Sequence, residues 1–86
     1  MITLLVLAGV VISNAEKMDV SKAVFYVGWY DVGKAALDGL KGVKSVEKGF
    51  HNLKEINTVF YDPSVITINE MEAALKSAGT YRGTAE

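Results

Sequence analysis

The chain has 86 residues and a formal net charge of −1, and half of its residues are hydrophobic. This length fits a single domain, and the hydrophobic content predicts a folded protein rather than a disordered one. Lysines are spaced singly with acidic residues between them, so the sequence has no basic patch of the kind that nucleic-acid-binding proteins carry. The absence of cysteine excludes disulfides, thiolate metal sites and thiol nucleophiles.

The N-terminal stretch, MITLLVLAGVVISNA, has no charged side chain and is typical of a secretory signal peptide. Its apolar run at 2–12 has the length of a signal hydrophobic region, and SNA supplies a small-x-small ending. We therefore expect a cleaved signal at 1–15, one domain at 16–86, and a periplasmic or secreted product. The alternative is a retained membrane anchor, or an additional apolar strand or helix, with a membrane-attached or cytoplasmic product.

The first part of the domain has a strand pattern followed by a helix pattern. SKAVFYVG at 21–28 is rich in β-branched and aromatic residues and ends in glycine, which predicts a strand. Asp31 can cap a helix whose C-cap is Gly42. The apolar positions that recur at helical spacing, and that we expect to be buried, are Val32, Ala35, Ala36 and Leu40.

Two strands, a helix and a final strand complete the pattern. VKSVEKGFH at 43–51 and KEINTVFYD at 54–62 predict a hairpin that turns between Gly49 and Leu53. A capping box at 67–70 opens a helix that ends at Gly79, with its expected buried face on Ile68, Met71, Leu75 and Ala78. TYRGT predicts a short last strand. The order β-α-β-β-α-β predicts an α+β ferredoxin-like sandwich, in which a four-stranded antiparallel sheet carries two helices on one face.

Three motifs carry a family resemblance: LKGVKSV at 40–46, VFYDP at 59–63 and Ala78-Gly79. They resemble the heavy-metal-associated domain, the family of copper chaperones, metal-ATPase N-terminal domains and periplasmic mercuric-ion-binding proteins. The resemblance implies the ferredoxin-like fold and a binding role in metal-ion transport or resistance. It also implies a soft metal ion, copper or mercury, as ligand and a metal-transport membrane protein as partner.

The family's metal loop, Gly-Met-x-Cys-x-x-Cys, falls on residues 28–34. Gly28 matches its glycine, but Trp29 stands at the methionine, and Asp31 and Lys34 stand at the two cysteines. Copper(I) and mercury(II) select thiolates, whereas a carboxylate is a hard ligand and an ammonium repels cations. The sequence therefore predicts a metal loop whose thiolate site is lost, with no metal ligand or cofactor assigned. The one histidine, His51, is expected to be solvated in the hairpin turn.

Aromatic residues are the remaining candidates for a binding surface. Trp29 either fills the core pocket that the methionine would occupy or forms, with Tyr30, an exposed anchor for a partner. Strand alternation predicts that Tyr26 and Phe60 lie together on the open sheet face, with Val24 and Thr58. The opposite alternation predicts the residues that face the helices: Phe25, Val27, Val59 and Tyr61.

No set of residues has the spacing of a catalytic site, so we expect a binding protein rather than an enzyme. The first hypothesis is a small exported binding domain, related to metal-transport carriers, whose thiolate site is degenerate. The second is a metal-independent protein-interaction or self-association module that uses the open sheet face. Neither hypothesis includes nucleic acid as a partner or a stable membrane span.

Overall fold

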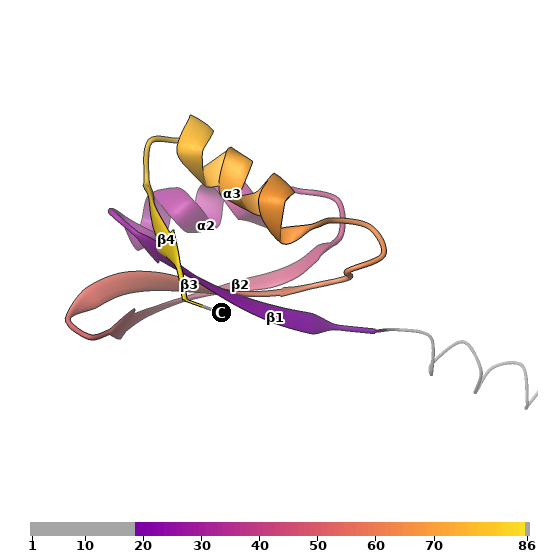
Figure 1. The fold of residues 1–86 in the computed structure, drawn as a ribbon, viewed down its shortest axis with the longest axis horizontal. Coiled ribbons are helices and arrows are strands. Elements are labelled where there is room, and N and C mark those ends of the chain that lie inside the picture. Colours follow the sequence, from indigo (N-terminus) through magenta and orange to yellow (C-terminus); the bar gives the residue numbers. More distant parts are fainter. Residues whose placement is uncertain (1–18, 86) are drawn as a thin grey trace, which may run out of the picture.

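The computed structural model describes residues 19–85, so the expected leader at 1–15 lies outside the described residues. The described part folds into four strands and two helices, shown in Figure 1: β1 (Ser21–Val27), α2 (Tyr30–Asp38), β2 (Val43–His51), β3 (Lys54–Tyr61), α3 (Ile68–Ser77) and β4 (Tyr81–Thr84). The strands form one antiparallel sheet in the order β2-β3-β1-β4. Both helices cover the same face of this sheet (Figure 1). The predicted ferredoxin-like fold is therefore confirmed.

The core lies between the sheet and the two helices. Strand alternation sends every second side chain of β1 and β3 toward the helices. All four residues predicted to face the helices are buried there, and the core consists of Ala23, Phe25, Val27, Leu37, Val46, Val59, Tyr61, Ile66, Met71 and Leu75. No helix of the described residues is long and apolar enough to cross a membrane.

The buried face of α2 differs from the predicted one. Gly33 and Leu37 are its buried residues, whereas Val32 is 39% exposed and Ala35 is also exposed. The helix is rotated so that its largest apolar side chain, Leu37, is fully enclosed, which removes more apolar surface from water than burying alanine would. Of the predicted face, Ala36 and Leu40 do pack against the core.

The predicted end of α2 is also wrong. Its C-cap is Gly39, and Gly42 belongs to the turn that leads into β2. The backbone of Gly42 has φ +96°, and a Cβ there would lie 2.9 Å from side-chain atoms of Val65 and Ile66. The glycine is therefore needed for the turn and for this close approach rather than for ending the helix.

The capping box predicted for α3 is confirmed, and so is the hairpin, which turns between His51 at the end of β2 and Lys54 at the start of β3. Glu70 donates its amide to Thr67 Oγ1 at 3.1 Å, and the Glu70 carboxylate accepts the Thr67 amide at 2.9 Å. Met71 and Leu75 are fully buried, and Gly79, with φ +74°, follows the end of the helix. Only Ala78, the C-cap residue, is exposed where burial was predicted.

Candidate functional site

The loop between β1 and α2 is tied to the start of β4. Gly28 donates its amide to the Thr80 carbonyl at 2.8 Å, and Trp29 donates its amide to Thr80 Oγ1 at 2.9 Å. Thr80 is 1% exposed, so both hydrogen bonds form against a fixed, buried residue. A Cβ on Gly28 would lie 2.8 Å from Nη2 of Arg82, which shows how closely β4 approaches this loop.

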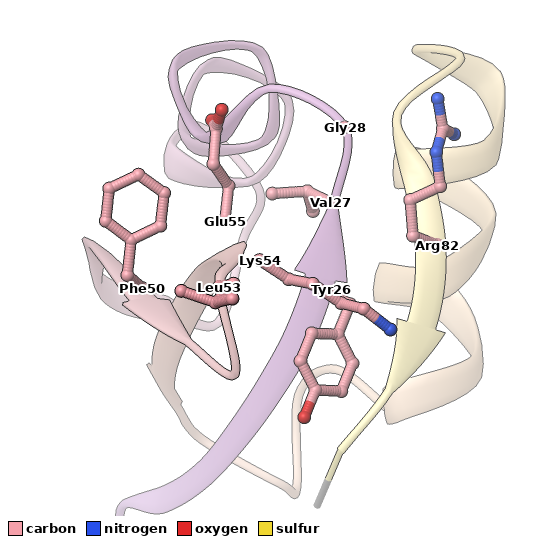
Figure 2. A pocket seen from close by; sticks show the side chains of 8 residues that line it. All are labelled: Tyr26, Val27, Gly28, Phe50, Leu53, Lys54, Glu55 and Arg82. Atoms are coloured by element: carbon pink, nitrogen blue, oxygen red, sulfur yellow. The ribbon is translucent and has the colours of Figure 1, made fainter.

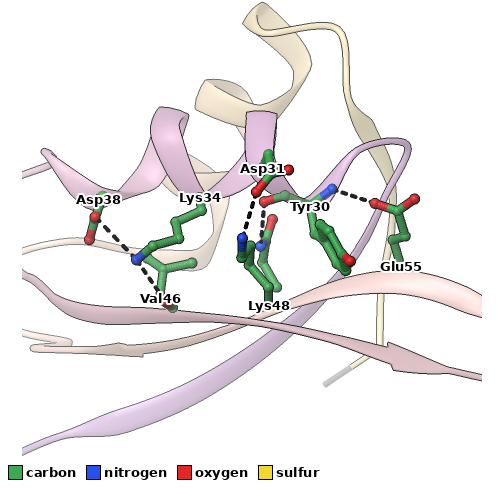
Figure 3. Close-up of polar contacts among 8 residues, drawn as sticks. Tyr30, Asp31, Lys34, Asp38, Val46, Lys48 and Glu55 are labelled. Atoms are coloured by element: carbon green, nitrogen blue, oxygen red, sulfur yellow. Dashed lines mark hydrogen bonds and ion pairs between the residues drawn. The ribbon is translucent and has the colours of Figure 1, made fainter.

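The first turn of α2 is held by a residue from β3. Trp29 is the N-cap and makes no side-chain cap, while Glu55 Oε1 accepts the Tyr30 amide at 2.7 Å (Figure 3). The prediction that Asp31 is the cap is wrong, because the helix already begins at Tyr30. Glu55 lies 25 residues further along the chain, so no local pattern in the sequence indicates it.

Asp31 and Lys34, which the sequence resemblance aligns with two cysteines, are both engaged in ion pairs. Asp31 Oδ1 lies 2.7 Å from Lys48 Nζ on β2. Lys34 Nζ lies 3.3 Å from Asp38 Oδ2 and donates to the Val46 carbonyl at 3.0 Å (Figure 3). The hydrogen bond and the charge of Asp31 raise the pKa of Lys48. Between residues 19 and 85 there is no group of three or more histidines and acidic residues that could hold a metal ion.

A buried asparagine on β3 holds the first residue of α2 through a hydrogen bond. Asn57 is fully buried and donates Nδ2 to the Tyr30 carbonyl at 3.1 Å. Its Oδ1 has no hydrogen-bond partner among the described residues. A Cβ on Gly33 would overlap this oxygen, so glycine is required where α2 crosses β3. The sequence contains one signal for this contact: Asn57 is a polar residue at a β3 position that strand alternation directs toward the helices, as it does Val59 and Tyr61.

Trp29 is 67% exposed, so the interpretation in which it fills a core pocket is wrong. The next residue, Tyr30, packs against the core instead, and Asn57 donates a hydrogen bond to its carbonyl. The ring of Tyr30 also lies 5.7 Å from that of Phe50, with Lys48 Nζ 5.4 Å from its centroid. Trp29 is therefore exposed, as the anchor interpretation requires, whereas Tyr30 is half-buried, and the role of the two residues in binding a partner stays a prediction.

A hollow of about 440 Å³ lies beside this loop, between the β2–β3 hairpin and β4. Figure 2 shows Phe50 and Leu53 on its hairpin side and Arg82 on its β4 side; Tyr26, Val27, Gly28, Lys54 and Glu55 also line it. Phe50 is 67% exposed and Leu53 is completely exposed. We call Phe50, Leu53, Lys54 and Arg82, which line this hollow, together with the exposed Trp29, which follows the lining residue Gly28 in the chain, the loop-end surface.

The loop-end surface combines apolar and cationic groups. Lys54 and Arg82 form no ion pair within the described part of the chain, although Lys54 Nζ lies 5.4 Å from the ring centroid of Tyr26. Leu53 has φ +61°, in the left-handed region that costs a leucine about 1 kcal/mol. A clustered, exposed apolar surface of this kind is typical of protein contact sites. Sequence reasoning identified Trp29 but missed Phe50 and Leu53, although the hairpin pattern places both at its tip.

The two aromatic residues predicted to lie together on the open face do not do so. Tyr26 pairs with Ile56, and Phe60 pairs with Lys22. Both side chains are on the open face, but the register separates them by about 13 Å along β3. Tyr26 instead lies against the exposed His51, with ring centroids 6.3 Å apart.

None of the protein-family models matches this sequence, and no curated protein matches it either. Two solved structures are similar. A candidate copper-ion-binding protein from Bacillus anthracis is 16% identical, with a TM-score of 0.63 over 79% of this chain and 99% of its own. The N-terminal domain of a potential copper-translocating P-type ATPase from Bacillus subtilis, solved in its Cu(I)-loaded state, is 19% identical, with a TM-score of 0.61 over 79% of this chain and 94% of its own. At these identities the similarity concerns the fold, and this chain has the ferredoxin-like fold of these two domains.

Proposed function

We propose that this chain is a small binding domain of a metal-handling system that docks a partner protein through the loop-end surface and holds no metal by thiolates. The observation that carries the proposal is the pairing of Asp31 with Lys48 and of Lys34 with Asp38, at the positions where the family resemblance implies cysteines. The two similar structures, a candidate copper-ion-binding protein and a domain of a potential copper-translocating ATPase, support a metal-handling context.

The charges around the loop oppose binding of a cation. Two ammonium groups, of Lys34 and Lys48, lie on this side of α2, and the nearby carboxylates are their partners. A soft metal would find neither a thiolate nor an imidazole on these residues. We expect the amide signals of residues 28–34 to stay unchanged when copper(I), mercury(II) or zinc is added in stoichiometric amounts, as measured by NMR. A specific shift of these signals would contradict this part of the proposal.

The partner that we propose is a metal-transport membrane protein, which the loop-end surface contacts through its soluble domain. The test is an NMR titration with the isolated N-terminal domain of a copper-translocating ATPase. We expect shifts at Trp29, Phe50 and Leu53, and loss of binding in Leu53→Lys. Val65→Lys is the matched control, because Val65 is 45% exposed and lies beside Gly42, at the other end of β2. Equal loss in both variants, or shifts confined to the open face, would contradict docking at this surface.

Export is part of the same proposal and is supported by the leader-like residues 1–15. Expression of the full chain in a bacterium, followed by fractionation and N-terminal sequencing, tests it. We expect a periplasmic product that begins at Glu16. A product that keeps Met1 in the cytoplasm would contradict export and leave the docking proposal unaffected.

A second candidate function is self-association through the open sheet face. It is favoured by the half-buried apolar side chains that lie on the face without helices, namely Tyr26, Ile56 and Phe60. Light scattering that gives a monomeric mass up to millimolar concentration would remove this candidate.

A further inference from the structure

One edge of the sheet has no strand beside it. β2 is outermost in the order β2-β3-β1-β4, and it pairs with β3 from Ser45 to His51 without a shift in register. Its outer edge therefore runs regularly over these residues, and no described residue forms a strand against it. Such an edge is a template to which another strand can add through main-chain hydrogen bonds.

Lys34 reaches this edge from α2. Its Nζ donates to the Val46 carbonyl at 3.0 Å, so this carbonyl points away from β3 and is already occupied. Asp38, one helical turn further along α2, lies 3.3 Å from the same ammonium and holds it over the strand (Figure 3). Because the ammonium occupies the position from which the amide of an added strand would reach the Val46 carbonyl, this contact closes the edge there.

The geometry of the edge suits a second copy of itself. Alternate residues of a strand direct their main-chain groups to the same side, so Lys48 and Phe50 present theirs outward with Val46. Two such edges, antiparallel and centred on Lys48, would exchange about six hydrogen bonds. Phe50, 67% exposed in the single chain, would then lie opposite Val46 of the other copy, while each Lys48 keeps Asp31 as its counter-ion.

We propose that the outer edge of β2 is a pairing surface for the same edge of a second copy, and that Lys34 keeps it closed. The proposal does not rest on the proposed function, although Phe50 belongs to both the loop-end surface and the outer edge of β2. Removing the ammonium frees the Val46 carbonyl, and two sheets can then join into one continuous sheet.

The test compares the full chain with Lys34→Met, which keeps the aliphatic stem but cannot donate, and with Lys34→Arg, which can. Lys41→Met is the control, because Lys41 is an exposed lysine between α2 and β2 and its loss changes the net charge equally. At millimolar concentration we expect Lys34→Met to show about twice the mass of wild type by light scattering. Hydrogen exchange at the Lys48 and Phe50 amides should slow in the same variant. Lys34→Arg and Lys41→Met should keep the mass of wild type, and exchange at these two amides should be unchanged in both variants.

Three results would overturn the proposal. One is a monomeric Lys34→Met with unchanged exchange at Lys48 and Phe50. Another is equal association of Lys41→Met, which would assign the effect to charge alone. The third is pairing of the wild-type chain through β2. Should Lys34→Met fail to fold, Asp38→Asn releases the ammonium without removing it, and it should shift the mass and the exchange in the same direction by a smaller amount.

Discussion

Gly33 and Asn57 are fitted to one another where α2 crosses β3. Asn57 Oδ1 occupies the space that a side chain at position 33 would need, and its Nδ2 holds the Tyr30 carbonyl. A glycine inside a helix costs about 1 kcal/mol relative to alanine, so the helix alone would favour the substitution. The overlap of an alanine Cβ with Asn57 Oδ1 opposes the substitution.

We expect Gly33→Ala to lower the free energy of unfolding by about 2 kcal/mol, because the overlap with Asn57 outweighs the gain in helix propensity. Urea denaturation measures this change. Gly39→Ala is the control, since a Cβ there meets nothing within 4 Å and the residue does not have a positive φ. If both variants are equally stable, the contact between Gly33 and Asn57 does not constrain the helix.

Leu53 is a residue whose backbone and side chain are both unfavourably placed. It has φ +61° and is completely exposed. We expect Leu53→Gly to raise the thermal midpoint, with a gain of about 1 kcal/mol, because Asn-Gly suits a two-residue turn with positive φ at both positions. The same variant should weaken docking of the ATPase domain. A gain in stability with unchanged docking would show that the leucine is not part of the contact.

The carboxylate of Asp62 accepts hydrogen bonds from the amide and the hydroxyl of Ser64 at 2.9 and 2.6 Å. These bonds lower the pKa of Asp62 below its ordinary value of 3.8. Their contribution to stability is therefore complete above pH 3.8 and is lost as the pH falls through the lower, folded-state pKa. We expect Ser64→Ala to move the pKa of Asp62 back toward 3.8, as followed by the carboxyl carbon shift in NMR. An unchanged pKa would mean that the Ser64 hydroxyl is not its cause, since alanine keeps the amide that also donates to Asp62.

The two helices show how far sequence reasoning reaches at the scale of elements. The cap of α3 was predictable because Thr67 and Glu70 are three residues apart and satisfy one another. The cap of α2 was not, because Glu55 is delivered by the pairing of β3 with β1. The buried face of α2 was misjudged for a related reason: it includes Gly33, which packs against Asn57 of β3, and periodicity within the helix carries no information on that contact.

We expect Glu55→Ala to destabilise the domain by about 1 kcal/mol and to speed hydrogen exchange of the Tyr30 amide, because the first turn of α2 loses its acceptor. Glu55→Gln keeps an acceptor oxygen and should lie close to wild type. Chemical denaturation and exchange measured by NMR together check this. Equal loss in the two variants would indicate that the charge of Glu55, rather than the hydrogen bond, supports the helix.

At the scale of the whole molecule, the order of strands and helices was enough to predict the fold. The candidate surface was predictable only in part, because Gly28 of the loop after β1 and Phe50 and Leu53 of the hairpin line the same hollow only in the folded chain. The positions of Asp31 and Lys34 within a family loop were inferred from short motifs. The structure adds what the motifs do not contain, the ion pairs of these two residues with Lys48 and Asp38.

Restoring the motif tests this view of the loop. We expect the double variant Asp31→Cys, Lys34→Cys to bind copper(I) or mercury(II) with no change of fold, because two thiolates at the start of a helix suit soft metals. Metal titration at low micromolar protein concentration, with far-UV circular dichroism as the check on folding, measures it. A folded variant that ignores both metals would mean that the loop is not equivalent to the family loop.

The loop at the edge of the loop-end surface depends on Thr80, a residue near the end of the chain. The hydrogen bond from the Trp29 amide to Thr80 Oγ1 joins residues 51 positions apart, so the loop after β1 is completed only when the last part of the domain arrives. Contacts of such long range form late, because the entropy of closing the chain must be met first. A nascent or C-terminally shortened chain that ends before Thr80 therefore lacks the acceptors to which the amides of Gly28 and Trp29 donate. A partner that recognises this surface would discriminate completed molecules from incomplete ones.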